Sequence, residues 1–192
     1  MQPPTTYAGQ ISADGQFQWD GTQWVPVARG TRFPTSWTRP MQLAAAGLLA
    51  FEAVFTVVTT AAFINHDAII KVLAQQNTQV PQGMTQDQLI GVMIGFFIGA
   101  AIVLAVFELL GAAGAYLGWR WGFWYVLVLL AFGALDALFN LGNLLRPDMS
   151  EFPLATSVIQ ELLCIAAAGV FTWMLIGVFM YGPWAMKRPG TN

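Results

Sequence analysis

Four long apolar runs constrain this chain more than any other feature of its sequence. They cover residues 41–64, 89–117, 121–145 and 155–181. Each run exceeds the roughly 20 residues that an α-helix needs to cross about 30 Å of hydrocarbon. Over the 192 residues 56% are hydrophobic and only 9% charged, whereas soluble domains carry about 25% charged residues. The sequence therefore predicts an all-α integral membrane protein with a bundle of four transmembrane helices.

Residues typical of helix ends flank these runs. Pro40 stands just before the first run, and a proline in the first turn of a helix loses no hydrogen bond. Thr85 and Gln88 precede the second run with the spacing of a capping box. Between the first two runs, residues 67–76 mix apolar and polar positions, which predicts either a short interfacial helix or an extension of the first span.

Basic residues lie unevenly about the runs and predict their orientation. One side carries Arg29, Arg32, Arg39, Arg120, Lys187 and Arg188, and the other only Lys71 and Arg146. By the positive-inside rule both termini are cytoplasmic. The first 40 residues lack the apolar core of a cleavable signal peptide. We therefore expect the cytoplasmic membrane of a bacterium, with residues 41–184 as the membrane domain, 29–40 as a basic linker and 185–192 as a cytoplasmic tail.

Aromatic residues gather on the same side as most of the bases. They are Trp37, Trp119, Trp121, Trp124, Tyr125, Tyr181 and Trp184. Tryptophan and tyrosine are enriched where a membrane meets water, so this group predicts an interfacial belt. The alternative is that some of these rings pack inside the bundle.

A hairpin signature lies within residues 1–28, ahead of the membrane region. Asp20-Gly21 favours a two-residue turn, because both central residues of a type I′ turn need positive φ. Closing that turn pairs Trp19 with Thr22 and Phe17 with Trp24. The three aromatic rings then share one face, where cross-strand contacts stabilise a hairpin. Residues 14–15 predict an earlier turn and a third short strand.

This segment also resembles a known kind of module. Residues 12–15 and 19–26, which read S-A-D-G and W-D-G-T-Q-W-V-P, resemble the short bacterial Trp-rich modules with a W-D-G-x-x-W core. Such modules are usually classed as domains of unknown function and often accompany membrane-spanning segments. The resemblance covers residues 11–26 only, and Phe17 stands near a place where the modules often have a further Trp. It implies a bacterial origin and a cytoplasmic mini-module, and it carries over no catalytic residue.

The aromatic hairpin has two interpretations. It is either a docking patch for a protein partner or the membrane surface, or a hairpin that only tethers the N-terminus. The candidate docking residues are Phe17, Trp19, Asp20, Gly21 and Trp24.

Each predicted span contains one acidic residue and no basic one. The acids are Glu52, Glu108, Asp136 and Glu161. A charge at the centre of a span costs roughly 2.5–3.5 kcal/mol on insertion scales, so we expect these side chains to face the bundle interior.

For three of these acids, helical spacing places further polar residues on the same face of the helix. At about 100° per residue, Glu52 shares a face with Thr56 and Thr59, Asp136 with Asn140 and Asn143, and Glu161 with Ser157 and Thr172. Glu108 instead lies on an alanine face of residues 101, 105, 112 and 115, which a partner helix can approach closely. The candidate intramembrane sites are Glu52, Glu108, Asp136, Asn140, Asn143 and Glu161.

Two further patterns concern helix packing. Gly91, Gly95 and Gly99 form a ridge opposite Glu108, which predicts packing against a neighbouring helix or against a second copy of the chain. Residues 50–56 align weakly with 134–140, and residues 108–113 with 161–166. These alignments are either chance matches between apolar segments or the trace of two duplicated helical hairpins, a pattern found in transporters.

Two classes of function stay open. The favoured class is a structural or accessory membrane component without enzymatic activity, which uses the hairpin for docking while the acids hold helices together. The alternative is a small oligomeric transporter or channel whose carboxylates carry protons or cations, with depth increasing in the order Glu108, Glu52, Asp136 and Glu161.

An enzyme is the least favoured interpretation. No HExxH, Walker loop, CxxC or Ser-His-Asp set is present, so we expect no catalytic residue, cofactor or metal. The single cysteine, Cys164, can make no internal disulfide. A net charge of −2 gives no basis for nucleic-acid binding.

Overall fold

The fold is mostly helical. The computed structural model describes residues 8–27, 32–75, 80–145 and 153–187. Its helices are α1 (Thr38–Phe63), α2 (His66–Gln75), α3 (Gln86–Tyr116), α4 (Arg120–Leu145) and α5 (Leu154–Met180), followed by the short 3-10 helix η2 (Pro183–Ala185). The strands are β1 (Phe17–Trp19), β2 (Trp24–Pro26), β3 (Phe33–Pro34) and β4 (Met186–Lys187). Four of these helices, α1, α3, α4 and α5, are long and apolar enough to cross a membrane.

The helix ends follow from local sequence. Thr85 caps α3: its side chain accepts from the Gln88 backbone N–H, and the Gln88 side chain accepts from the Thr85 N–H, so the predicted capping box is confirmed. Between α1 and α2 the chain leaves the helical conformation at Ile64, where ψ is 97°. The Asn65 side chain then accepts from the Ala68 N–H, so α2 is a helix of its own and not an extension of α1.

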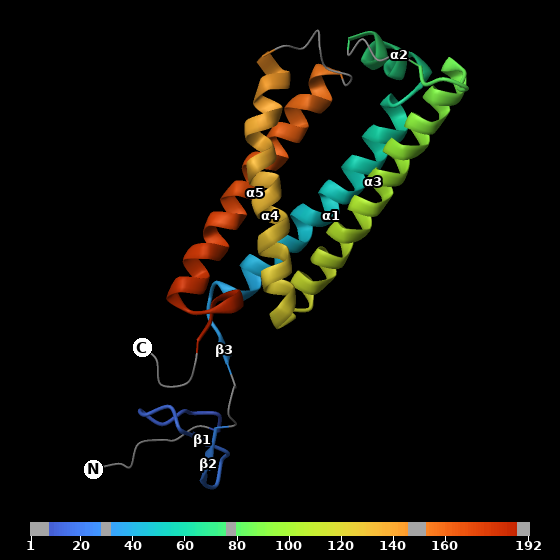
Figure 1. The fold of residues 1–192 in the computed structure, drawn as a ribbon. Coiled ribbons are helices and arrows are strands. Elements are labelled where there is room, and N and C mark those ends of the chain that lie inside the picture. The colour runs from blue at the N-terminus through green and yellow to red at the C-terminus, as the bar shows by residue number, and fades with distance from the viewer. Residues whose placement is uncertain (1–7, 28–31, 76–79, 146–152, 188–192) are drawn as a thin grey trace.

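The long helices form two antiparallel pairs, α1 with α3 and α4 with α5 (Figure 1). Helices α1 and α4 each contact both α3 and α5, which is the arrangement that two related hairpins would adopt. Duplication itself stays a prediction. A tight turn at Gly118, with φ of +67°, joins the two pairs. The positive φ favours glycine at this position, and a Cβ there would come within 2.6 Å of the end of the Gln42 side chain, which would have to shift.

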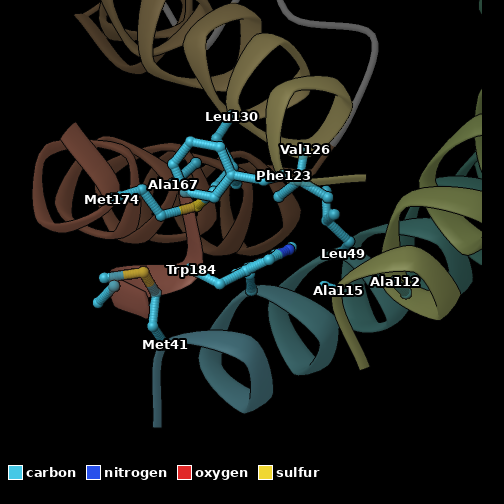
Figure 2. Close-up of a cluster of buried hydrophobic side chains, with 12 residues drawn as sticks. Met41, Leu49, Ala112, Ala115, Phe123, Val126, Leu130, Ala167, Met174 and Trp184 are labelled. Atoms are coloured by element: carbon cyan, nitrogen blue, oxygen red, sulfur yellow. The ribbon is translucent and has the colours of Figure 1, made fainter. Parts of the chain in front are cut away.

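All four long helices pack closely at the end of the bundle where α1 begins and α5 ends, here called the terminal end. Its buried residues are Met41, Ala45, Leu49, Ala112, Ala115, Phe123, Val126, Leu130, Ala167, Met174, Trp184 and Ala185. Figure 2 shows Trp184 in the middle of this cluster, between Met41 and Phe123. The Trp184 indole N–H donates to the Trp119 carbonyl at 2.8 Å, which satisfies its only polar atom. Trp184 is therefore a core residue.

The C-terminal segment is held against the start of α1. Strand β4 pairs with β3, and the hydroxyls of Thr35 and Thr38 both donate to the Ala185 carbonyl. Trp184 and Ala185 have φ values of 57° and 50°, a region that side-chain-bearing residues seldom adopt. The contacts on both sides keep this turn in place.

The predicted aromatic belt is divided between two roles. Trp119, Trp121 and Trp124 are exposed around the start of α4, as an interfacial group would be. Trp37 instead packs edge-on against Trp173 and Tyr181, and Trp184 is buried. Exposure of these three rings is what an interfacial belt requires, but the belt itself stays a prediction, and packing accounts for Trp37 and Trp184.

At the opposite end, which carries α2 and is here called the loop end, the two pairs separate (Figure 1). A second buried cluster lies there. Its members are Ile64 in the turn between α1 and α2, Ile69 and Leu73 in α2, and Ile90 in α3. None of the described side chains of α4 and α5 belongs to it. Among the described residues, the loop-end halves of the two pairs are therefore packed separately.

The N-terminal hairpin forms with a register that differs from the prediction. Trp19 pairs with Trp24 and Phe17 with Pro26, so the loop has four residues and not two. The Asp20 carboxylate explains the longer loop, because it accepts hydrogen bonds from the Thr22 N–H, the Thr22 hydroxyl and the Gln23 N–H. The predicted pairing of Trp19 with Thr22 and of Phe17 with Trp24 was therefore wrong.

The shared aromatic face survives this correction, because the register moves by two residues and side chains alternate with period two. The rings of Trp19 and Trp24 meet edge to face with centroids 5.6 Å apart. The earlier turn also forms, where the Gly15 N–H donates to the Ser12 carbonyl. Among the described residues, the predicted third strand is reduced to one bridge between Ile11 and Gln18.

Candidate functional site

A cavity whose mostly apolar wall carries several acidic and polar side chains occupies the region where the two helix pairs begin to separate. Its deep part has a volume of about 550 Å³, and an adjoining part toward the loop end has about 350 Å³. Thr56, Leu104, Glu108, Asp136 and Gln160 line both parts, so we treat the two as one and call it the carboxylate cavity. All four long helices contribute to its wall. Its size falls in the usual range for small-molecule sites, roughly 300–1,000 Å³.

Three of the four predicted acids meet in this cavity. Glu52 on α1, Glu108 on α3 and Asp136 on α4 line the deep part. One carboxylate oxygen of Glu108, Oε2, is buried and has no hydrogen-bond partner among the described residues. A buried polar atom without a partner is costly, which is typical of a site that binds something.

Asp136 is the centre of a small polar network between α4 and α5. The Asn140 side-chain N–H₂ donates to Asp136 Oδ2 at 2.8 Å, one helical turn along α4. The Cys164 thiol lies 3.9 Å from the same carboxylate oxygen, and the Gln160 amide donates to Cys164 Sγ at 3.7 Å. This network orients the Asp136 carboxylate and leaves Glu52 and Glu108 as the less constrained acids of the cavity.

Threonine and serine side chains continue the polar wall toward the loop end. Thr56, Thr59 and Thr60 from α1 face Thr156 and Ser157 from α5 across this part of the cavity. The Thr59 hydroxyl donates to the Phe55 carbonyl of its own helix, as threonines in apolar helices commonly do. The polar stripe predicted on α1 thus lies on the cavity wall.

The fourth acid lies elsewhere. Glu161 lines neither part of the cavity, although its neighbour Gln160 lines both. Its Oε2 is buried and, among the described residues, has no hydrogen-bond partner. Glu161 is therefore a carboxylate on α5, in a helix able to span a membrane, that lies outside the cluster. The side chain of Asn143 lies outside the part of the chain that the structure describes.

The carboxylates surround a space and do not converge on a point. Among the described residues, no three Asp, Glu, His or Cys side chains are close enough to hold one metal ion. Apolar and aromatic side chains alternate with the acids around the deep part, including Leu104, Phe107 and Phe132. The cavity therefore combines negative groups with apolar surface.

Glycine and alanine positions show which faces of α3 are packed. Ala101, Ala105, Ala112 and Ala115 are buried, as expected for the face that carries Glu108. In contrast, a Cβ placed on Gly91, Gly95 or Gly99 would meet no atom within 4 Å. Among the described residues, no neighbour packs against the glycine ridge, and its use by a second copy stays a prediction.

Sequence reasoning missed two members of the site, Gln160 and Cys164. The prediction chose Glu161 because it is charged. Glu161 lies one residue beyond Gln160 on α5 and therefore about 100° away from it around the helix. Gln160 and Cys164 are four residues apart, as are Asp136 and Asn140. A search for polar pairs with this spacing would have found the correct face of α5.

The hairpin is a second candidate site, for docking. Trp24 is 42% exposed and Phe17 37% exposed, on the face that also carries Trp19. Asp20 and Gly21 form the loop beside it, where Gly21 has φ of +110°. The five residues predicted as a docking patch are thus brought together in one small unit.

No protein-family model matches the chain, and neither the curated proteins nor the solved structures contain a significant match. The fold and the cavity define the class: a helical protein with four helices able to span a membrane and a carboxylate-lined cavity among them.

Proposed function

We propose that this protein is an integral membrane carrier that binds an organic cation in the carboxylate cavity and exchanges it for protons. The observation that carries the proposal is the meeting of Glu52, Glu108 and Asp136, from three different helices, around one cavity. Among the described residues that line either part of the cavity, none is Lys, Arg or His. Negative charge without a counter-charge in apolar surroundings is costly, so a cationic guest is the natural complement.

The size and the lining of the cavity favour an organic cation over a metal ion. A metal ion requires several oxygen ligands within about 2.6 Å, and the described acids do not converge in that way. A space of about 550 Å³ instead suits a molecule with apolar surface. Phe107 and Phe132 supply aromatic rings, which attract cations when water is excluded.

Protons balance the charge when the guest is absent. Three carboxylates around one cavity repel one another if all are ionised, so we infer that the empty cavity holds protons on some of them. Arrival of the cation then releases protons, and its departure takes them up again. Coupling of this kind needs no residue other than Glu52, Glu108 and Asp136, with Asn140 holding Asp136 in place.

The membrane location is part of the same proposal. We propose the cytoplasmic membrane of a bacterium, with both termini in the cytoplasm, on the basis of four helices of sufficient length and hydropathy and of the uneven distribution of the bases. A Cys164→Ala chain with Trp24→Cys tests the orientation with an impermeant thiol reagent on intact cells. Residue 24 should be labelled only after the cells are opened, and labelling of intact cells would contradict the orientation.

Binding of ethidium, a fluorescent aromatic cation, to the detergent-purified full chain tests the cavity itself. We expect saturable binding that falls at least tenfold with Glu108→Gln or Asp136→Asn. Glu161→Gln is the matched control, because it removes an intramembrane acid that does not line the cavity. Equal effects of Glu108→Gln and Glu161→Gln, or no saturable binding, would contradict the proposal.

Transport requires a separate measurement in vesicles. Proteoliposomes that contain ethidium and a pH-sensitive dye should show proton movement opposite to the cation only with the wild-type chain. A chain that binds ethidium but moves no protons would restrict the protein to cation binding.

A second function, docking through the hairpin, is favoured by the exposed rings of Phe17 and Trp24. In this interpretation the protein is an accessory component without enzymatic activity, and residues 1–28 recruit a protein partner. Affinity capture with the full chain and with Trp24→Ala tests it. A partner retained equally by both chains would show that the aromatic face is not the docking surface.

A further inference from the structure

The hydrogen-bond donors of the carboxylate cavity are used differently from its acceptors. Several neutral polar side chains line the cavity beside the acids, among them Thr59, Asn140, Thr156 and Gln160. A hydroxyl or an amide has both donors and acceptors, whereas an ionised carboxylate has acceptors alone. The bonds that these groups already make within the protein therefore determine what a guest must supply.

The amides of the cavity wall donate to the protein. The Asn140 side-chain N–H₂ donates to Asp136 Oδ2 at 2.8 Å and to the Asp136 backbone carbonyl at 3.2 Å. The Gln160 side-chain N–H₂ donates to Cys164 Sγ at 3.7 Å. The carbonyl oxygen of an amide can only accept, so each amide adds an acceptor to those of the carboxylates.

Hydroxyls in the part of the cavity toward the loop end are used in the same way. The Thr59 hydroxyl donates to the Phe55 carbonyl at 2.7 Å, and the Thr156 hydroxyl donates to the Pro153 carbonyl at 2.7 Å. A hydroxyl has a single hydrogen, so these two oxygens can offer a guest only their lone pairs. This part of the wall therefore also presents acceptors.

Glu108 supplies an acceptor that the protein leaves unused. Its Oε2 atom is buried and has no hydrogen-bond partner among the described residues. The Glu108 side chain lines both parts of the cavity. A nearby positive charge would balance a charge on this oxygen, but only a donor would supply the missing hydrogen bond. A guest that satisfies Glu108 therefore needs a donor as well as a charge.

We infer that the guest of the carboxylate cavity is a protonated amine that donates its N–H groups to this wall, and not a quaternary ammonium ion. The inference rests on the proposed cation binding and goes beyond it, because it distinguishes between cations of equal charge. An ammonium group with three N–H donors, like that of lysine, can bond several of the acceptors at once. A quaternary ammonium has no N–H group and would leave the buried Glu108 oxygen unpaired.

Two cations that share a charge and a phenylethyl group test the inference: 2-phenylethylammonium and its trimethylated quaternary derivative. Isothermal titration calorimetry measures their binding to the detergent-purified full chain near neutral pH, where an alkylammonium with a pKa of about 10 keeps its proton. We expect the primary ammonium to bind about tenfold more tightly or better, because hydrogen bonds between charged groups are strong.

Gln160→Met tests the acceptors of the wall, because it removes an amide carbonyl without changing the charge of the cavity. The affinity for the primary ammonium should fall about threefold or more. The affinity for the quaternary ion should stay unchanged, which also shows that the variant is folded. Thr172→Val is the control on α5, because the Thr172 hydroxyl donates to the Ala168 carbonyl and does not line the cavity. It should change neither affinity.

The possible outcomes separate this inference from the proposed function. Tighter binding of the primary ammonium, weakened in Gln160→Met alone, supports the protonated amine as guest. Equal affinities, or tighter binding of the quaternary ion, would overturn the protonated amine and leave cation binding in place. An equal loss of both affinities in Gln160→Met would overturn the role of its carbonyl as an acceptor. Binding of neither cation would overturn the proposed function and the inference with it.

Discussion

The two ends of the helical bundle are built differently. At the terminal end all four long helices meet around Trp184, and the C-terminal segment closes the cluster. Toward the loop end the α1–α3 and α4–α5 pairs separate, and their acids line a cavity. Apolar packing thus holds the bundle at one end, which leaves the other half free to keep unpaired polar groups. In the proposed function, ligand binding would therefore use the half of the helices that contributes less to the apolar core.

Loss of the Trp184 ring, at the centre of the terminal cluster, should lower the free energy of unfolding more than any other change considered. Trp184→Ala removes a fully buried ring and its hydrogen bond to the Trp119 carbonyl. We expect the free energy of unfolding to fall by about 3–5 kcal/mol. Equilibrium unfolding in mixed micelles measures it. Trp124→Ala, at an exposed position of α4, should cost less than about 0.5 kcal/mol. Similar costs for the two variants would remove the distinction between core and belt tryptophans.

Two glycines distinguish packed from unpacked helix faces. A Cβ on Gly122 would lie 3.2 Å from the Gly114 backbone, which cannot easily move, so Gly122→Ala should cost about 1–3 kcal/mol. Gly95→Ala meets no atom and should stabilise α3 by up to about 1 kcal/mol through helix propensity. Unfolding and sizing in detergent measure both variants. If Gly95→Ala instead destabilised the protein and dissociated an oligomer, the glycine ridge would be a contact between copies.

An acid of the cavity should contribute to binding at the expense of stability. Glu108→Leu removes a buried carboxylate oxygen without a described partner, so we expect a gain of about 1 kcal/mol in unfolding free energy together with loss of ethidium binding. The same unfolding and fluorescence assays report both quantities. A variant that lost stability would show that Glu108 holds helices together, as the accessory function would require.

The stability of the hairpin should depend slightly on pH. Hydrogen bonds from the Gln23 N–H, the Thr22 N–H and the Thr22 hydroxyl lower the pKa of Asp20 below its ordinary value. Since the folded pKa is the lower one, this stabilisation is fully present above the ordinary pKa and is lost as pH falls through the lowered pKa. NMR signals of the Trp24 indole in the full chain should report the loss. Asp20→Asn keeps an acceptor and should remove the pH dependence, and an unchanged titration would contradict the assignment.

Much of the fold could be predicted because its signals are local. Apolar runs predicted the four long helices, and Thr85 with Gln88 predicted a helix start. The rotation of each helix against its neighbours is not local, so the sequence placed Glu161 with the other acids and missed Gln160. Trp184 likewise had the sequence context of an interfacial ring, and only the return of the C-terminal segment buries it.

The hairpin register and the cavity could not be predicted from single local signals. Asp20-Gly21 favours a tight turn, but three hydrogen bonds to the Asp20 carboxylate stabilise a longer loop. The cavity exists because two helix pairs separate. The sequence of a single helix does not determine that separation. The identity of three of its acids could still be predicted, because a carboxylate in an apolar span has few other places to lie.

Reaction of a thiol in the cavity wall with charged reagents tests the central claim most directly. Cys164, the only cysteine of the chain, is buried, so the test uses a Cys164→Ala chain with Thr56→Cys, at a position that lines both parts of the cavity. In this variant, a cationic methanethiosulfonate should react at least tenfold faster than an anionic one of similar size, and ethidium should slow the reaction. Equal rates for the two reagents, or no protection by ethidium, would contradict a cation-binding cavity.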